Sequence, residues 1–182
     1  GSGIIFATLI GGSGEDDAIM GVRLGLQDNW YVAGHTRSQD FPVTAGAAQG
    51  RLGGESDAYL AEISADGSRL VYATYLGGKL DEFAEHKPWL PLERSMLLAG
   101  FTASPDFPST PGSFQGSLKG KGDGFLAKLS PDGKKLYFST LLGSSGGEIL
   151  LMPTIDDAGN VLVVGSTGSS DFPVTPGAVY TL

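Results

Sequence analysis

The sequence predicts an all-β protein, in the form of a β-propeller made of four-stranded antiparallel blades. Three observations predict it: phrases that recur about every 66 residues, Asp-Gly turns between β-rich runs, and runs that are apolar on both faces. Glycine supplies 29 of the 182 residues, against a usual share of about 7%. With 41% hydrophobic residues, the chain can bury a core.

The repeat is carried by markers that stay in register along the chain. Residues 6–12 (FATLIGG) return at 72–78 (YATYLGG) and, shortened, at 138–143 (FSTLLG), in steps of 66. A second marker, Ser-x-Asp-Phe-Pro-x-Thr-x-Gly, starts at Ser38, Ser104 and Ser169, so the last step is one residue shorter. These markers predict one propeller segment over residues 1–182, with about 2.8 blades, and the units are 6–71, 72–137 and an incomplete 138–182.

Each unit is predicted to hold four short strands. Residues 57–64 and 70–76 flank an Asp-Gly turn, and residues 149–155 and 161–167 flank a turn of the form Asp-Ala-Gly-Asn. Both faces of these strands are apolar, so the sheets should be covered on both sides, as in stacked propeller blades. The expected faces are Leu70, Tyr72, Thr74 and Leu76 on one side and Val71, Ala73 and Tyr75 on the other.

Other fold classes fit less well. No segment shows the periodicity of an amphipathic helix, which argues against an α/β fold. A β-helix usually repeats over a shorter period than the one seen here. A β-sandwich stays open as the alternative.

The phrases resemble a known family, the bacterial SBBP (β-propeller) repeat. The matching stretches are 72–78, 104–115 (SPDFPSTPGSFQ), 123–129 (DGFLAKL) and 156–167, which together cover much of the repeat. The resemblance implies an extracellular or cell-surface module in large bacterial proteins, and it supplies no catalytic residues. Residues 20–29 and 85–94 depart from the pattern, and Pro88 is awkward for a regular strand.

An arc of about 2.8 blades is too short for a closed propeller, which usually has about 4–8 blades. The chain should begin on the last strand of one blade and end after the second strand of another. An open arc would expose unpaired strand edges and an apolar blade face. We therefore expect the ring to be completed by further blades from a longer protein or by other copies of the chain.

Composition restricts the partners. Twenty acidic residues against 12 basic ones give a formal charge of −8, which argues against nucleic acid as a partner. The absence of cysteine excludes disulfides and thiolate chemistry. We expect no membrane insertion, because no apolar run approaches the length of a bilayer span. Surface proteins and glycans remain possible partners.

The Ser-x-Asp-Phe-Pro loops are the first candidate site. We expect them to be self-packed structural loops, because a binding site usually breaks the sameness of repeats, but a ligand-facing rim or a cation site stays open. In each loop the Asp can accept backbone hydrogen bonds, the Phe can act as a buried anchor, and the Pro fixes φ. The residues are Asp40, Phe41, Pro42, Asp106, Phe107, Pro108, Asp171, Phe172 and Pro173.

A second candidate is a set of carboxylates in register after the Gly-Gly markers, at Asp16, Glu82 and Glu148. One carboxylate per blade near the central channel could bind Ca²⁺, which takes about 6–8 oxygen ligands. No complete calcium loop is present, so solvated turn carboxylates are the expected reading, with no cofactor.

The remaining candidates are single residues. His35 and His86 occupy different repeat positions and predict no metal pair, and Trp30 and Trp89 are expected to pack rather than to stack on a sugar. The sequence therefore predicts a non-catalytic scaffold or binding module. Two alternatives stay open: a subunit of a homo-oligomeric or filamentous surface assembly completed by interchain blade packing, and a glycan-active enzyme or Ca²⁺-stabilised glycan-binding module.

Overall fold

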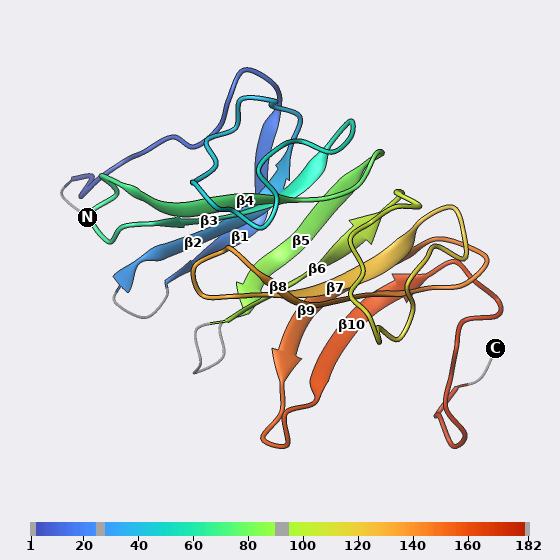
Figure 1. The fold of residues 1–182 in the computed structure, drawn as a ribbon. Coiled ribbons are helices and arrows are strands. Elements are labelled where there is room, and N and C mark those ends of the chain that lie inside the picture. Colours follow the sequence, from blue (N-terminus) through green and yellow to red (C-terminus); the bar gives the residue numbers. More distant parts are fainter. Residues whose placement is uncertain (1–2, 25–27, 90–94, 181–182) are drawn as a thin grey trace.

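A computed structural model describes residues 3–24, 28–89 and 95–180 of the chain. The described residues form ten β-strands and no α-helix, and every sheet is antiparallel. The all-β, antiparallel fold predicted from the sequence is therefore confirmed. Figure 1 shows three sheets lying side by side as an open stack.

Two four-stranded sheets and one two-stranded sheet follow each other along the chain, each with its strands in chain order. In the second sheet, each strand begins one full repeat after its counterpart in the first. The first sheet contains β1 (Asp16–Leu24), β2 (Trp30–Thr36), β3 (Asp57–Ile63) and β4 (Leu70–Leu76). The second contains β5 (Glu82–Trp89), β6 (Met96–Thr102), β7 (Asp123–Leu129) and β8 (Leu136–Leu142). The third contains β9 (Glu148–Ile155) and β10 (Val161–Thr167).

The tight turns use glycine where the backbone requires it. Gly67, Gly133 and Gly159 adopt positive φ values of 72°, 66° and 86° in the β3–β4, β7–β8 and β9–β10 turns. In the first of these turns, Asp66 Oδ1 accepts the Ser68 N–H at 3.1 Å. These hydrogen bonds lower the pKa of Asp66 to about 2, with the hydroxyl of Ser64 the largest contributor.

Apolar clusters cover both faces of the complete sheets. Strand β3 is buried at every position. One cluster lies between the first and second sheets and joins Tyr31, Leu60 and Tyr72 to Leu98 and Phe125. A second cluster lies on the outer face of the first sheet, and a third lies between the second sheet and the pair β9–β10.

Residues at equivalent repeat positions face the same direction along the stack in successive sheets. Val32 lies on the outer face of the first sheet, and its counterpart one repeat later, Leu98, lies on the face that the second sheet turns toward the first. Tyr31 faces the second sheet, and its counterpart Leu97 faces β9–β10. Each sheet thus has one face directed toward the sheet that precedes it in the chain, which we call the backward face, and one directed toward the sheet that follows, the forward face.

The prediction of which side chains of residues 70–76 share a face is wrong for Leu70. Leu70 packs with Ile63 on the outer face of the first sheet, away from Tyr72 and Leu76. The cause is a register shift in the β3–β4 pairing between Glu62 and Ile63, which turns Leu70 to the other face. A sequence that alternates regularly gives no sign of such a shift.

The prediction that the chain begins with the last strand of a blade is also wrong. Residues 6–10 form no strand. They nevertheless lie over the outer face of the first sheet, where Ile10 packs on the second cluster. Phe6 covers the turn glycine Gly67 as Tyr72, one repeat later, covers Gly133. The segment therefore occupies the position of a preceding sheet's last strand, although no described strand pairs with it.

The described strand pairing does not set residues 20–29 and 85–94, which were expected to depart from the repeat, apart from the third unit. The pairing of the first two strands shifts in all three sheets, between Asp17 and Gly21, between Glu85 and Trp89, and between Leu162 and Val164. The side chains of residues 85–94, including His86 and Trp89, lie outside the described residues, as do residues 25–27. The sheets end at Leu76 and Leu142, so the fourth strand of the first sheet crosses the expected unit boundary at 71/72.

Two long loops, 37–56 and 103–122, protect the outer edges of the complete sheets. The loop after β2 bonds to β4 through Thr44 N–H to Ala73 O at 3.1 Å, and Tyr75 N–H donates to Gln49 O at 3.1 Å. The loop after β6 bonds to β8 in the same way. The edge strands β4 and β8 therefore do not present free ladders of donors and acceptors.

We predict that the cluster between the first two sheets dominates stability. Phe125 is fully buried there, so Phe125→Ala should lower the free energy of unfolding by roughly 3–5 kcal/mol. Leu162, 49% exposed on β10, provides a matched truncation, and Leu162→Ala should cost less than about 1 kcal/mol. Urea denaturation measures both, and equal losses would contradict the assignment of the core.

Candidate functional site

The residues predicted as sites gather where each sheet begins, in a cluster of hydrogen bonds that we call the carboxylate clamp. In the second sheet its centre is Glu82, the first residue of β5. Glu82 Oε2 accepts the Gly78 N–H at 2.7 Å, and Oε1 accepts the Thr102 hydroxyl at 2.6 Å. The carboxylate thereby joins the turn after β4 to the end of β6.

The loop after β6 completes the clamp. Ser104 Oγ accepts the Leu80 N–H at 2.8 Å, and Asp106 Oδ1 accepts the Lys79 N–H at 3.1 Å. The Lys79 ammonium also lies 3.4 Å from Asp106 Oδ2. These bonds lower the pKa of Asp106, with the Lys79 backbone N–H the largest contributor. Asp106 therefore holds the connection between two sheets.

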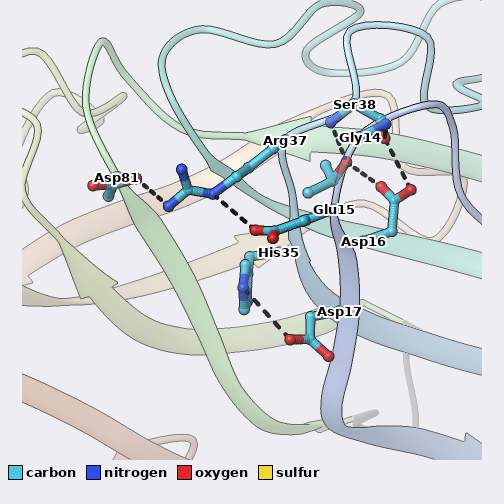
Figure 2. A network of polar contacts seen from close by, with 9 residues as sticks. Gly14, Glu15, Asp16, Asp17, His35, Arg37, Ser38 and Asp81 are labelled. Carbon is cyan, nitrogen blue, oxygen red and sulfur yellow. Dashed lines mark hydrogen bonds and ion pairs between the residues drawn. The ribbon is translucent and has the colours of Figure 1, made fainter.

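The first sheet repeats the arrangement. Asp16 Oδ2 accepts the Gly12 N–H at 2.7 Å and the Ser38 hydroxyl at 2.8 Å, and Thr36 donates to its other oxygen. Figure 2 shows Ser38 between Asp16 and Gly14, whose N–H it accepts at 2.8 Å. The loop Asp is Asp40, which accepts the N–H and hydroxyl of Ser13.

The third sheet repeats it again, although it has only two strands. Glu148 accepts the Ser144 N–H at 3.0 Å and the Thr167 hydroxyl at 2.7 Å, and Ser169 donates to it as well. Asp171 accepts the Ser145 N–H and hydroxyl. The clamp therefore forms at the start of every sheet.

The expectation of solvated turn carboxylates is wrong for two of the three residues. Glu82 is 0% exposed and Glu148 is 1% exposed, whereas Asp16 is half-buried. The carboxylates lie inside because the turn N–H groups and the strand-end hydroxyls need an acceptor away from water. Both oxygens of each carboxylate accept such bonds, so each carboxylate has hydrogen-bond donors within the protein. Among the residues described by the structure, no three His, Cys, Asp or Glu side chains come together as a metal group.

Two equivalent glutamates differ in their pKa values. Burial raises the pKa of Glu82 above its usual range, despite bonds from Ser104, Thr102 and Gly78. Burial acts in the same direction on Glu148, but hydrogen bonds from Ser169, Thr167 and Ser144 outweigh it and lower the pKa. Glu82 lies between two complete sheets, whereas the sheet of Glu148 has only two described strands.

A second buried carboxylate lies beside Glu82. Asp57 is 0% exposed, and its Oδ2 accepts the Gln49 amide N–H at 2.6 Å and the Gly53 N–H at 2.8 Å. Oδ1 of Asp57 has no hydrogen-bond partner. This oxygen and Glu82 Oε2 both lie against Gly77, where a Cβ atom would sit within 2.5 Å of each. Burial raises the pKa of Asp57 to about 6, and the charge of Glu82 adds to the shift.

This acid pair could suggest glycoside hydrolysis, which uses two carboxyl groups with separated pKa values. Neither Asp57 nor Glu82 lines any of four surface cavities formed by described residues, which lie on the outer face of the first sheet and between the sheets. The pair also recurs, because Asp123 and Glu148 lie in the same way against Gly143. The buried acid pair therefore recurs from sheet to sheet as a contact between neighbouring sheets.

The burial of each loop phenylalanine depends on whether its sheet has all four strands. Phe41 is 3% exposed with its ring 4.5 Å from that of Tyr59, and Phe107 is 4% exposed with its ring 4.9 Å from that of Phe125. Phe172 is only half-buried, because no described strand supplies the matching aromatic. The prolines that follow behave alike: Pro42 and Pro108 are half-buried, and Pro173 is exposed.

The single-residue candidates His35 and Trp30 both pack against aromatic rings. His35 lies edge-on to Phe83 at 4.8 Å, with Nε2 4.0 Å from Asp17 Oδ2 (Figure 2). Trp30 packs against Phe6 and donates its indole N–H to Ala65 O at 3.2 Å. Trp30 also lines an apolar groove of about 350 Å³ on the outer face of the first sheet.

An exposed ion pair adds a further link between sheets. Figure 2 shows Arg37 between Glu15 of its own sheet and Asp81, which precedes β5. The distances are 3.7 Å and 3.6 Å, and the Arg37 side chain is 44% exposed. An exposed pair of this kind contributes at most about 1 kcal/mol, so the buried clamp matters more than this link.

Three sets of clamp residues were missed by sequence reasoning. They are the strand-end threonines Thr36, Thr102 and Thr167, the loop glutamines Gln49 and Gln115, and the strand-start acids Asp57 and Asp123. The signal was present, because the threonine stands two residues before the loop serine in every unit. Threonine is common in strands because of its high β propensity, so its recurrence at a strand end does not by itself indicate a clamp.

Comparison with known proteins adds no family: no protein-family model matches the chain, and no curated protein matches it. The resemblance to the SBBP repeat therefore stays a prediction. Within the residues that the structure describes, no helix has the length and apolar character needed to cross a membrane.

The raised pKa of Asp57 predicts that stability falls as the pH rises from about 4 to 6. Its folded pKa of about 6 exceeds the ordinary value of 3.8, so the folded chain binds more protons than the unfolded chain in this interval. The fall attributable to Asp57 is at most about 3 kcal/mol. In Asp57→Asn, urea midpoints measured across this interval at constant ionic strength should change less with pH.

The exposed Asp66 provides the control for that experiment. Its pKa is lowered to about 2, so its contribution is lost only as the pH falls below about 4. Asp66→Asn should therefore keep the wild-type dependence between pH 4 and 6. A dependence that survives unchanged in Asp57→Asn would show that Asp57 is ionised in the folded chain at low pH.

The clamp itself is tested by removing one hydroxyl. Thr102→Val keeps the shape of a fully buried side chain but removes the donor to Glu82 and the acceptor for the Ser104 N–H at 2.9 Å. We expect a loss of about 1–3 kcal/mol in the free energy of unfolding. Thr154→Val, at a half-buried position on β9, should change it by less than about 0.5 kcal/mol. Equal effects in thermal or urea melts would count against the clamp.

Proposed function

We propose that the chain is a segment of a β-propeller of the SBBP-repeat type, in which each four-stranded sheet is one blade. It serves as a non-catalytic scaffold or binding surface, outside the cell or at the cell surface. Its partners are further blades or copies of the chain, and a surface protein or glycan bound to the loops. The location and the bacterial setting rest on the resemblance in the sequence.

The observation that carries the proposal is the repeated use of the two sheet faces. Phe125 faces the first sheet and Leu126 faces β9–β10, so one sheet buries apolar residues in two directions. Packing of this kind places sheets around a common axis when it is continued. The first strands agree with that geometry, because β5 lies against both β1 and β9.

The buried acids support a scaffold rather than an enzyme. Catalytic carboxylates need access to a substrate and at least one oxygen that can act on it. Glu82 and Glu148 are enclosed and bonded to turn N–H groups and strand-end hydroxyls. Their role is to join the end of one sheet to the start of the next.

Self-assembly is the second candidate, and exposed apolar side chains at the two ends of the stack favour it. Ile5 is 99% exposed and Leu9 98% exposed beside the first sheet, and Val179 is 90% exposed after β10. Large exposed apolar patches mark interaction surfaces. Concentration-dependent light scattering that shows oligomers would support this candidate over a monomeric scaffold segment.

The test of the proposal is to complete the third sheet. Residues 118–142 carry β7 and β8, and by the repeat they follow the counterpart of Leu182. A chain that carries a second copy of residues 118–142 after Leu182 should melt about 5–10 °C higher, because each kcal/mol raises Tm by roughly 2–4 °C at this size. It should also bind less of a dye specific for apolar surface.

A shuffled version of the same extension is the matched control, since it adds the same residues without their pattern. It should leave Tm unchanged. Equal melting of both extended chains would overturn the proposal that the third sheet is an incomplete blade.

A further inference from the structure

In the described part of the chain, the third sheet ends at β10, and no described strand pairs with the outer edge of that strand. In the complete sheets, β2 pairs with β3 and β6 pairs with β7 along the whole strand, from Thr102 opposite Asp123 to Met96 opposite Leu129 in the second sheet. Strand β10 pairs with β9 alone among the described strands, and it lies at the edge of the stack in Figure 1. An open edge offers a row of backbone donors and acceptors to an added strand.

The complete sheets show which side chain the added strand must carry. Phe125 on β7 lies opposite Gly100, and its ring covers the glycine on the face that Phe107 also contacts. In the first sheet, Tyr59 lies opposite Gly34 and packs on Phe41. In both sheets an aromatic residue of the third strand thus lies opposite the glycine of the second strand and packs on the loop phenylalanine.

The third sheet has the glycine and the loop aromatic but not the aromatic between them. Gly165 and the half-buried Phe172 stand at the equivalent positions, one repeat after Gly100 and Phe107. Between the second sheet and β9–β10 the structure has an apolar cavity of about 240 Å³, whose lining includes Leu126, Leu150 and Val163.

The cavity has a filled counterpart between the first two sheets. Four of its lining residues, Leu126, Leu142, Leu150 and Val163, correspond through the repeat to Leu60, Leu76, Ala84 and Leu98. Those four belong to one cluster that also contains Phe125. The cavity therefore has the position and lining of the site that the β7 aromatic occupies one step earlier.

We propose that the open edge of β10 is an acceptor site for an extended segment of defined chemistry. The segment pairs antiparallel with β10, with an acidic residue opposite Thr167, a small residue next, and an aromatic residue third, opposite Gly165 and inside the cavity. The partner is thus a strand of the pattern seen in β3 (DAYLAEI) and β7 (DGFLAKL). The inference rests on the proposed equivalence of the three sheets.

The test uses a labelled peptide with the sequence of residues 121–131 (KGDGFLAKLSP), added to the whole chain. Fluorescence anisotropy should show saturable binding. A control peptide in which the Phe and Leu are exchanged has the same composition but turns the aromatic to the opposite face. We expect it to bind at least ~10-fold more weakly, as loss of a packed aromatic predicts.

Two chain variants locate the site. Phe172→Ala removes the loop aromatic whose counterpart one repeat earlier, Phe107, packs on Phe125, and it should weaken binding of the first peptide by roughly 5–10-fold. Leu9→Ala, a truncation of a 98% exposed side chain at the other end of the stack, should leave binding unchanged. Phe172 is only half-buried and Leu9 is exposed, so both variants should keep the wild-type melting temperature.

Three outcomes would overturn the inference: no binding, equal binding of the two peptides, or a dimer paired through two β10 edges that the peptide does not dissociate. The completed-sheet experiment separates this inference from the proposed function. If the chain extended by residues 118–142 is stabilised while the free peptide does not bind, the blade proposal stands and the acceptor site fails. If the peptide binds in register while the extension gives no stabilisation, the acceptor site stands without the blade proposal.

Discussion

The structure depends on one constraint: its sheets are apolar on both faces, so none can be stable in water without a neighbour. Burial of apolar surface is the main favourable contribution to folding, and here much of it lies between sheets. Phe125 and Leu126 are adjacent in the chain yet serve two different interfaces. Folding of one sheet is therefore coupled to the presence of the next, as in other repeat proteins whose stability is shared between neighbours.

The carboxylate clamp sets the geometry of that coupling. Apolar packing is not directional and would allow neighbouring sheets to slide, whereas hydrogen bonds to a buried carboxylate fix the turn relative to the next strand pair. Glu82 joins the turn after β4 to the end of β6, and the backbone bridge from Glu82 N–H to Ser56 O at 2.8 Å adds a second link to the first sheet. The loop Asp residues complete this connection at the surface.

Much of the fold could be predicted because local signals and the repeat agreed. The Asp-Gly turns, the strand positions and the antiparallel arrangement follow from glycine placement and β propensity. Leu70 was assigned to the wrong face because a register shift leaves no mark in an alternating pattern. The burial of Glu82 was missed because an acid after Gly-Gly resembles an exposed turn, and only the three-dimensional structure shows the N–H and O–H groups around it. Residues 6–10 were expected to form a strand, but no described strand offers them an edge to pair with.

The distinct backward and forward faces of the sheets give the stack a polarity. The surface at β1–β4, marked by Val32 and Tyr59, differs in kind from the surface at β10, marked by Leu162 and Val164. A two-fold axis would bring like surfaces together and could not reproduce the contact seen between successive sheets. Any association that does reproduce it must be heterologous, so it ends in a closed ring when the rotation between sheets allows and otherwise grows without limit.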